Sequence, residues 1–430
     1  MQLINKRNLI ILAIIIVVAV GIILSPQIND YRTIKYQMNG GNYLAANDLD
    51  NAEKNFKKAL ALNPDSYFAH YGLGKIAFAK SDFDAAEDYF LKTLDLKPNF
   101  SLEPRIHTDL AAVYLLQGDY QKSVDYADQV AIDKVESADE ADRIEAEAYL
   151  IKGLSFMLLG ETTSAKESFE KCSEIQIENE AYRTLIEQRL NNNFGNLYTL
   201  LGECDKAIEY YQTDLDLIED PLVGSVSYFG IGKCQFYLKN YEKSVENLEY
   251  GLQLFDDNNI LMPDPNFQRF EFFQELGKSY LRLGNFEKSR EYFEKIVEIK
   301  DSIEYNRAFE IPFAEVSTSI GLGEISLAKG ENSTARTYFN TGLKIFSSLE
   351  PVFFNEKVNI SFLSLVLHYN IATAYYNDGD LTRALQEIQE AENIITSITE
   401  KERPFIEAIQ WFDNGKNIFQ NIASLKSEVI

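Results

Sequence analysis

Histidine and cysteine, which often carry acid–base, nucleophilic or metal chemistry, are few in this sequence and widely spaced. They are His70, His107, His368, Cys172, Cys204 and Cys234. The cysteines are odd in number and lack Cys-x-x-Cys spacing, so they indicate neither a set of disulfides nor a zinc site. No glycine-rich phosphate loop follows a strand-like pattern. Because no local motif assigns a role to the histidines and cysteines, their role depends on which helices or strands position them.

An acidic cluster, Asp256, Asp257 and Asp264, is a further candidate, for calcium. Its spacing differs from that of a twelve-residue calcium loop, in which ligands recur at alternate positions. The spacing favours a solvated acidic linker instead. We therefore expect no metal ion and no cofactor.

The composition is that of an ordered and acidic protein. Of the 430 residues, 46% are hydrophobic, 25% are charged and only ten are prolines, which is unlike a disordered chain. The formal net charge of −25 would repel nucleic acid and anionic membrane surfaces over long range. We therefore expect no nucleic-acid ligand. Basic or neutral protein partners are favoured, although acidity also serves solubility.

The positioning elements follow from an internal repeat. Residues Gly40, Ala52, Phe56, Leu60 and Pro64 recur 34 residues later as Gly74, Ala86, Phe90, Leu94 and Pro98. This period is typical of a repeat built from two helices. Gly40 and Ala52 are expected where the two antiparallel helices cross, because only small side chains let the backbones approach closely. Pro64 would end the second helix, since proline cannot continue the hydrogen-bond ladder.

The small residue of the first helix identifies further copies. Aligned on it, nine candidate copies contain Gly40, Gly74, Ala111, Gly153, Gly195, Gly232, Gly277, Gly323 and Ala372. Seven residues later a turn glycine recurs in six copies, and sixteen residues later an aromatic ring recurs in six. The sixth copy has Lys239 where the turn glycine belongs. The separations grow from 34 to as many as 49 residues, and we expect longer helices or linkers to absorb the difference.

This pattern resembles the tetratricopeptide repeat. The resemblance implies an all-α, right-handed superhelical solenoid of about nine helix-turn-helix units. We expect two regular 34-residue units in 30–99 and seven longer units in 101–400. Because each unit leaves an apolar face for its neighbour, we also expect a C-terminal capping helix in 402–428, with a bend near Gly415.

The three histidines occupy the same position of the repeat. Each lies four residues before the small residue of its copy, where a tyrosine stands in other copies. Groups on the same rung of a stacked array cannot converge on one substrate. We therefore expect these rings to fill space between helices, as Cys172 and Cys204 are expected to do, and we expect no enzyme activity.

The amino-terminal run Leu9–Leu24 is apolar, carries no charge and follows Lys6 and Arg7. At about 1.5 Å per residue this run spans roughly 24 Å, so it needs its neighbours to approach the ~30 Å hydrocarbon core. We expect a transmembrane signal-anchor helix at 8–25 after a short tail at 1–7. The amino terminus would be cytoplasmic and the repeats extracytoplasmic. A cleaved signal peptide, and hence a secreted chain, is the alternative.

By the resemblance, the first helices line the concave side of the superhelix and face a protein ligand. The groove positions transferred to this chain are Arg105, Thr108, Asn192, Asn196, Phe229, Lys233, Gln274, Lys278, Tyr369 and Thr373. Asn192 and Asn196 are one helical turn apart, and a carboxamide both donates to and accepts from a peptide backbone. Solvated polar positions are the alternative for this pair. Family members that clamp a carboxylate terminus use basic residues where Glu271 and Glu275 stand here, so such a terminus is expected to be repelled.

These observations predict a membrane-anchored scaffold or adaptor that catalyses nothing and has no small-molecule substrate. It would bind peptide segments or helices of partner proteins in a concave groove. Two alternatives stay open, both drawn from the resemblance and the length of the array. One is a peptide-responsive signalling regulator of the type with long repeat units, and the other is a structural spacer in an envelope complex.

Overall fold

The described residues fold into helices joined by short turns, with no strand among them. The structure is a computed structural model, and it describes residues 29–97, 102–217, 221–257, 265–302, 310–349, 354–408 and 416–430. The prediction of an all-helical fold is confirmed for these residues. The chain divides into two compact units. We call them the N-terminal unit (Met1–Ser155 with Glu174–Asn179) and the C-terminal unit (Phe156–Ser173 with Glu180–Ile430).

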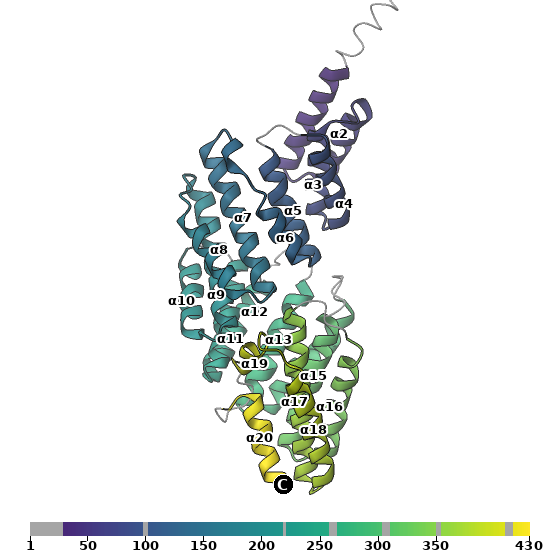
Figure 1. The fold of residues 1–430 in the computed structure, drawn as a ribbon, viewed down its shortest axis with the longest axis vertical. Coiled ribbons are helices and arrows are strands. Elements are labelled where there is room, and N and C mark those ends of the chain that lie inside the picture. Colours follow the sequence, from purple (N-terminus) through teal and green to yellow (C-terminus); the bar gives the residue numbers. More distant parts are fainter. Residues whose placement is uncertain are drawn as a thin grey trace, which may run out of the picture. The chain divides into compact units, whose positions relative to one another are not determined.

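The N-terminal unit begins with a helix of residues 29–45 and continues with short helices (Figure 1). These are α2 (Leu49–Leu62), α3 (Tyr67–Ala79), α4 (Phe83–Asp95), α5 (Glu103–Gln117), α6 (Tyr120–Ala127), the 3₁₀ turn η1 (Ile132–Lys134) and most of α7 (Ala138–Leu158). Acidic N-caps start several of them. The Asp48 carboxylate accepts a hydrogen bond from the Asn51 amide, and Asp82 does the same for Ala85, which satisfies one of the otherwise unpaired amides of a first turn.

The C-terminal unit contains the end of α7 and the remaining helices. They are α8 (Thr162–Glu174), α9 (Glu180–Leu200), α10 (Cys204–Leu217), α11 (Pro221–Tyr237), α12 (Tyr241–Asp257), α13 (Pro265–Arg282), α14 (Phe286–Ile299), η2 (Lys300–Ser302), α15 (Glu310–Ala328), α16 (Asn332–Phe346), α17 (Phe354–Asn377), α18 (Leu381–Ser397), α19 (Arg403–Ala408) and α20 (Ile418–Val429). The first helices lengthen along the chain: α3 has 13 residues and α17 has 24. Longer helices therefore absorb part of the growing repeat length.

The recurring aromatic ring lies between two first helices. Phe56 of α2 is 1% exposed. A methyl group at Gly40 would lie 2.8 Å from the Phe56 ring, and one at Gly72, in the first helix of the next pair, would lie 2.4 Å from it. Only glycine fits at both positions, because carbon atoms at those distances overlap. The ring thus joins one helix pair to the next, which explains the aromatic residue sixteen positions after the small one.

The turn glycines adopt the left-handed conformation that their register predicts. Positive φ angles between 72° and 83° occur at Gly118, Gly160, Gly202, Gly284, Gly330 and Gly379. In the sixth copy Lys239 takes a φ of 62° at the same place. A non-glycine residue there meets some steric cost. The turn is therefore kept even where its preferred residue is missing.

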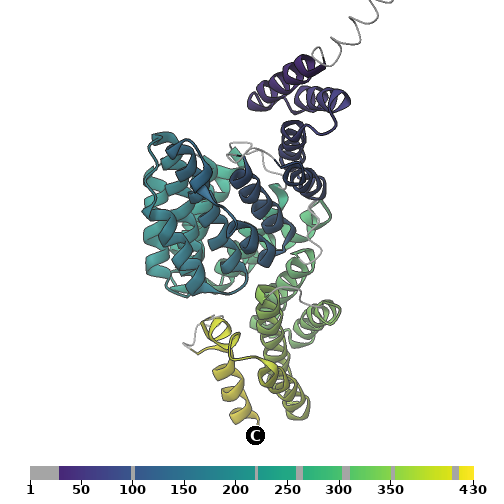
Figure 2. The ribbon, with the colours of Figure 1, turned by 45° about the horizontal axis from the view of Figure 1, so that its top comes forward.

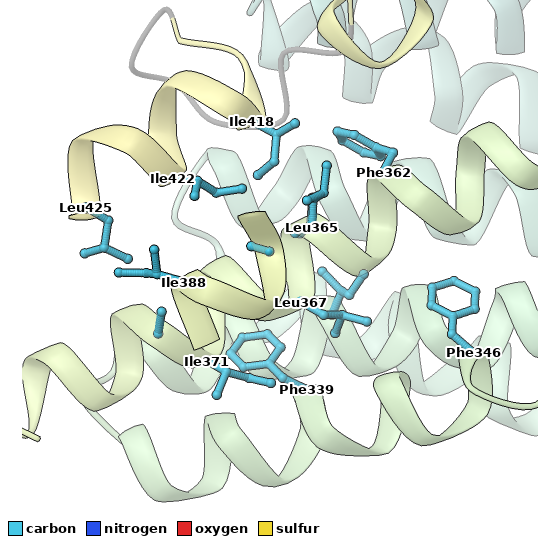
Figure 3. Close-up of a cluster of buried hydrophobic side chains, with 14 of the residues drawn as sticks. Phe339, Phe346, Phe362, Leu365, Leu367, Ile371, Ile388, Ile418, Ile422 and Leu425 are labelled. Atoms are coloured by element: carbon cyan, nitrogen blue, oxygen red, sulfur yellow. The ribbon is translucent and has the colours of Figure 1, made fainter. Parts of the chain in front are cut away.

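The carboxyl-terminal helix α20 packs on the last helix pair. Ile418, Ile422 and Leu425 of α20 join a cluster that includes Leu365 of α17 and Ile388 of α18 (Figure 3). A second view shows this yellow helix beside the olive helices that precede it (Figure 2). The sequence predicted one capping helix in 402–428. The structure has two helices there, α19 and α20, and Gly415 lies outside the described residues.

The single-pass membrane topology expected from the sequence is corrected. Crossing a bilayer takes about 20 consecutive apolar residues, and none of the helices in the described ranges is both long and apolar enough. The run Leu9–Leu24, on which the expectation of a helix at 8–25 rested, lies outside the described residues. Membrane anchoring is therefore no part of the function proposed below.

Candidate functional site

The three histidines are held separately, each by a partner near its own helix pair. His70 Nε2 lies 2.9 Å from the Pro64 carbonyl oxygen, and His107 Nδ1 lies 3.0 Å from that of Gln129. His368 Nδ1 lies 2.7 Å from a carboxylate oxygen of Glu387. Across the part of the chain that the structure describes, no three histidine, cysteine or carboxylate side chains cluster closely enough to hold a metal ion. Of the acidic cluster, Asp256 is bonded to Arg269 at 2.8 Å, and Asp264 is not described.

A cavity of about 680 Å³ lies within the C-terminal unit, inside the range of roughly 300–1,000 Å³ that is common for ligand sites. Helices α9, α10 and α11 and the end of α7 form part of its wall, and residues of α17 and α19 also line it. Figure 1 shows α19 near α11, although the two are far apart in the sequence. The cavity is therefore a product of the tertiary fold.

Three of the predicted groove residues line this cavity: Asn196, Phe229 and Lys233. Asn192, a fourth, lies one turn before Asn196 on α9 and accepts a hydrogen bond from its Nδ2 at 3.1 Å. The groove positions that the resemblance implies thus include three of the lining residues. They missed Val358 and Phe405, which line the cavity from α17 and α19, because no repeat offset marks either residue.

The Asn196 carboxamide is held in one orientation. Its Oδ1 accepts a hydrogen bond from the Tyr211 hydroxyl at 2.8 Å, and its Nδ2 donates to Asn192. Since an amide nitrogen carries two hydrogens, one N–H of Asn196 is left for a ligand. The Tyr211 ring is itself wedged between Gly195 and Gly230, where an added methyl group would come within 2.6 Å and 2.3 Å of it. The packing that joins two helix pairs therefore also orients a polar group at the cavity.

Lys233 and Tyr237 lie one helical turn apart on α11, and both line the cavity. Burial raises the pKa of the Tyr237 hydroxyl to about 12, so the hydroxyl keeps its proton. The charges that Tyr237, Glu275 and Glu271 carry when ionised raise the pKa of Lys233 above its ordinary value, against the opposing effect of burial. Lys233 is therefore an ammonium, and both groups offer hydrogens to whatever occupies the cavity.

One of the buried cysteines also reaches the cavity. Cys204, the first residue of α10, lines it, while Cys234 of α11 is fully buried and lies 3.2 Å from the Thr199 hydroxyl. A hydrogen bond to Cys234, together with burial, raises the pKa of the Cys204 thiol. A thiol that keeps its proton is a poor nucleophile. Cys204 is thus unsuited to act as a nucleophile, which agrees with the space-filling role expected from its position in the repeat.

The other predicted groove residues lie elsewhere. In the N-terminal unit, Arg105 is paired with Glu147 at 2.7 Å, and Thr108 is 2% exposed. On α13, Gln274 is half-buried and Lys278 is buried against Glu275, its ion-pair partner at 2.6 Å. On α17, the half-buried Thr373 donates a hydrogen bond to the half-buried Tyr369 at its carbonyl oxygen, 2.9 Å away.

A buried carboxyl next to this site makes stability depend on pH. Asp214 of α10 is 1% exposed; it accepts a hydrogen bond from Ser227 at 2.6 Å, while its second oxygen has no partner in the described residues. Burial raises its pKa to about 6. Between pH 4 and 6 the folded state therefore holds a proton that the unfolded state has lost, so stability falls as the pH rises. We expect Asp214→Asn to remove a fall of about 1–3 kcal/mol across this range.

Urea unfolding of the wild-type chain and Asp214→Asn, followed by circular dichroism at pH 4.5 and 7.5, measures this difference. The exposed Asp205→Asn on the same helix is the control and should leave the pH dependence unchanged. Equal pH dependence in the wild type and Asp214→Asn would contradict the raised pKa.

Comparison with known proteins identifies the repeats. Models of the tetratricopeptide repeat match residues 38–100, 146–176, 192–223 and 270–302. The resemblance drawn from the sequence is thereby confirmed. The matched segments include Gly40, Gly74, Gly153, Gly195 and Gly277, which are small residues of the aligned copies.

A curated relative and two solved structures extend the comparison. The CTR9 homolog of Arabidopsis thaliana is 25% identical over 313 residues, which cover 66% of this chain but only 26% of that protein. The apo form of RapI is 14% identical with a TM-score of 0.59 and covers 85% of this chain and 98% of its own. A Rap protein complexed with competence and sporulation factor is 13% identical with a TM-score of 0.54, covering 87% of this chain and 99% of its own. At these identities the two structures show a shared fold.

Proposed function

Because this chain carries tetratricopeptide repeats, we propose that it is an interaction scaffold that binds an extended segment of another protein in the cavity of its C-terminal unit. The observation that carries this proposal is the convergence of Asn196, Phe229 and Lys233 on one cavity. The resemblance to the tetratricopeptide repeat implies the same three residues as ligand-facing positions.

The lining suits a peptide. The remaining N–H of Asn196 is directed by two fixed hydrogen bonds and can donate to a backbone carbonyl of an extended chain. Apolar walls formed by Met157, Leu200, Phe229 and Phe405 can bury side chains of the same segment. A few fixed polar groups set among apolar walls are the usual composition of a binding site.

Binding, and not catalysis, is the activity that the chemistry of the lining supports. Lys233 is held as an ammonium, and the Cys204 thiol and the Tyr237 hydroxyl are held protonated. None of the three is in the ionisation state that a nucleophile or a general base requires. Each is suited to donate a hydrogen bond.

A peptide-responsive regulator is the second candidate, and the construction of the cavity favours it. Met157 of α7 and Phe405 of α19 are far apart in the sequence of the C-terminal unit, yet both line the same cavity. A ligand that contacts both would favour the arrangement in which these two helices are closest, since it binds that arrangement better. A scaffold would keep its dimensions on binding. Small-angle scattering distinguishes the two, because the radius of gyration falls on binding only for the regulator.

Selection from a displayed library of random dodecapeptides on the full chain tests the proposal. Selected peptides, synthesised and titrated by calorimetry, should bind the wild type and lose about 10-fold in affinity with Asn196→Ala, which removes one hydrogen bond. The matched control is Asn340→Ala on α16, where an exposed asparagine bonds only to its own helix. Failure to select any peptide, or equal affinities for Asn196→Ala and the wild type, would refute binding at this cavity.

A further inference from the structure

The charge of the cavity lining is opposite to that of the chain. The charged residues among the described residues that line the cavity are Lys233 and Lys239, and no Asp or Glu lines it. Yet the chain as a whole has a formal net charge of −25. The cavity therefore differs in charge from the rest of the chain. It favours an anionic ligand group, in contrast to the basic or neutral partner expected from overall composition.

The Lys233 ammonium has neither a hydrogen-bond partner nor an ion-pair partner among the described residues. Among the described residues, no hydrogen bond to its ammonium and no carboxylate within ion-pair distance is found. The nearby Glu275 is engaged by Lys278 at 2.6 Å. A partly buried ammonium without a hydrogen-bond acceptor forgoes stabilisation that a ligand can supply, and hydrogen bonds to a charged group are roughly twice as strong as neutral ones.

Tyr237 supplies a second donor beside it. Tyr237 lines the cavity one turn after Lys233, and the described residues provide its hydroxyl with no hydrogen-bond acceptor. An ammonium and a hydroxyl on one face of α11 match the two oxygens of a carboxylate. Phe229 precedes Lys233 by one turn, and Leu238 follows Tyr237 directly. Phe229 and Leu238 thus add apolar surface to the cavity that holds the donor pair, which suits the apolar neighbours of an internal acidic residue.

We propose that the cavity selects segments with an internal Asp or Glu, whose carboxylate binds Lys233 and Tyr237 while neighbouring apolar side chains pack on Phe229 and Leu238. This inference rests on the function proposed above and names the chemistry of its ligand. It differs from a clamp for a carboxylate terminus, in which basic residues would occupy the positions of Glu271 and Glu275. Here those carboxylates lie on α13, and the donors lie on α11.

The test uses a peptide from the dodecapeptide selection, acetylated and amidated so that its only carboxylates are side chains. Changing its acidic residue from Glu to Gln should weaken binding to the wild type by roughly 10- to 100-fold, the range for a charge-assisted hydrogen-bond pair. Binding to Lys233→Met should be weak for both peptides and differ less than about 3-fold between them. Tyr237→Phe should lose a few-fold in affinity for the Glu peptide alone.

Two controls separate charge recognition from loss of folding. Lys233→Arg keeps the charge and should retain a preference for the Glu peptide. Lys295→Met removes a half-buried lysine of α14 that is paired with Glu291 and does not line the cavity, and it should bind as the wild type does. Circular dichroism should report equal helix content for all variants.

The outcomes distinguish this inference from the proposed function. Selected peptides that bind through Asn196 but lack an acidic residue, or that tolerate Glu to Gln, overturn the inference and leave the scaffold function standing. An unchanged preference for Glu in Lys233→Met also overturns it. If no peptide binds at the cavity, both fall together.

Discussion

Replacing Tyr211 by alanine is expected to lower the free energy of unfolding by about 3–5 kcal/mol, the usual cost of removing a buried aromatic ring. The ring is 1% exposed and is enclosed by Gly195 and Gly230, two residues without side chains that could move into the space. The cavity left behind would separate α9 from α11. Urea unfolding followed by circular dichroism measures the change.

Tyr211→Phe is the matched variant, because it keeps the ring and removes only the hydroxyl. It should cost about 1 kcal/mol, the worth of one hydrogen bond, here the 2.8 Å bond to Asn196. It should also weaken peptide binding, because the Asn196 carboxamide loses the contact that orients it. A loss below 1 kcal/mol in Tyr211→Ala would show that the ring does not join the two helix pairs.

Replacing Lys278 by methionine is expected to destabilise the C-terminal unit by about 3–5 kcal/mol, because it leaves a buried carboxylate without its partner. Lys278 is 8% exposed and Glu275 is 4% exposed. The ammonium donates to Glu275 at 2.6 Å, and the second oxygen of Glu275 already lacks a hydrogen-bond partner in the described residues. Burial lowers the pKa of Lys278, which reflects the cost of keeping its charge away from water.

The double variant Lys278→Met/Glu275→Leu tests this explanation. Replacing a buried ion pair by apolar residues of similar volume is often neutral or stabilising, so the double variant should recover most of the loss. Thermal and urea unfolding of the two single variants and the double variant complete the cycle. If the double variant is as unstable as the sum of the single ones, the loss comes from packing and not from the unpaired charge.

The burial of Lys278 also affects how partner-binding experiments on Lys278 and Lys233 are interpreted. The register assigned Lys233 and Lys278 to the same groove, since each follows the small residue of its copy by one position. Lys233 lines the cavity, whereas Lys278 is buried in an ion pair. A loss of partner binding in Lys278→Met would therefore report a loss of stability, while Lys233→Met tests recognition.

The candidate site was predictable only in part. The resemblance to the tetratricopeptide repeat implies Asn196, Phe229 and Lys233 as groove positions, counted from the small residues Gly195 and Gly232. Tyr211 was identified as a packing ring, but its bond to Asn196 was not foreseen. Tyr237, Val358 and Phe405 carry no repeat signal, so no reading of the offsets would have placed them at a cavity.

Residue types and their spacing were enough to establish the helical repeat, with small residues at the crossings, aromatic rings sixteen positions later and glycines at the turns. These features are local, since each concerns contacts within one helix pair or with the next. Which polar residues line a cavity and which are buried in ion pairs became visible only in the folded protein. That outcome depends on contacts such as those of α17 and α19 with the cavity of α9 and α11. Helix pairs come together in this way through the summed rotations along a stack, and no single repeat encodes that sum.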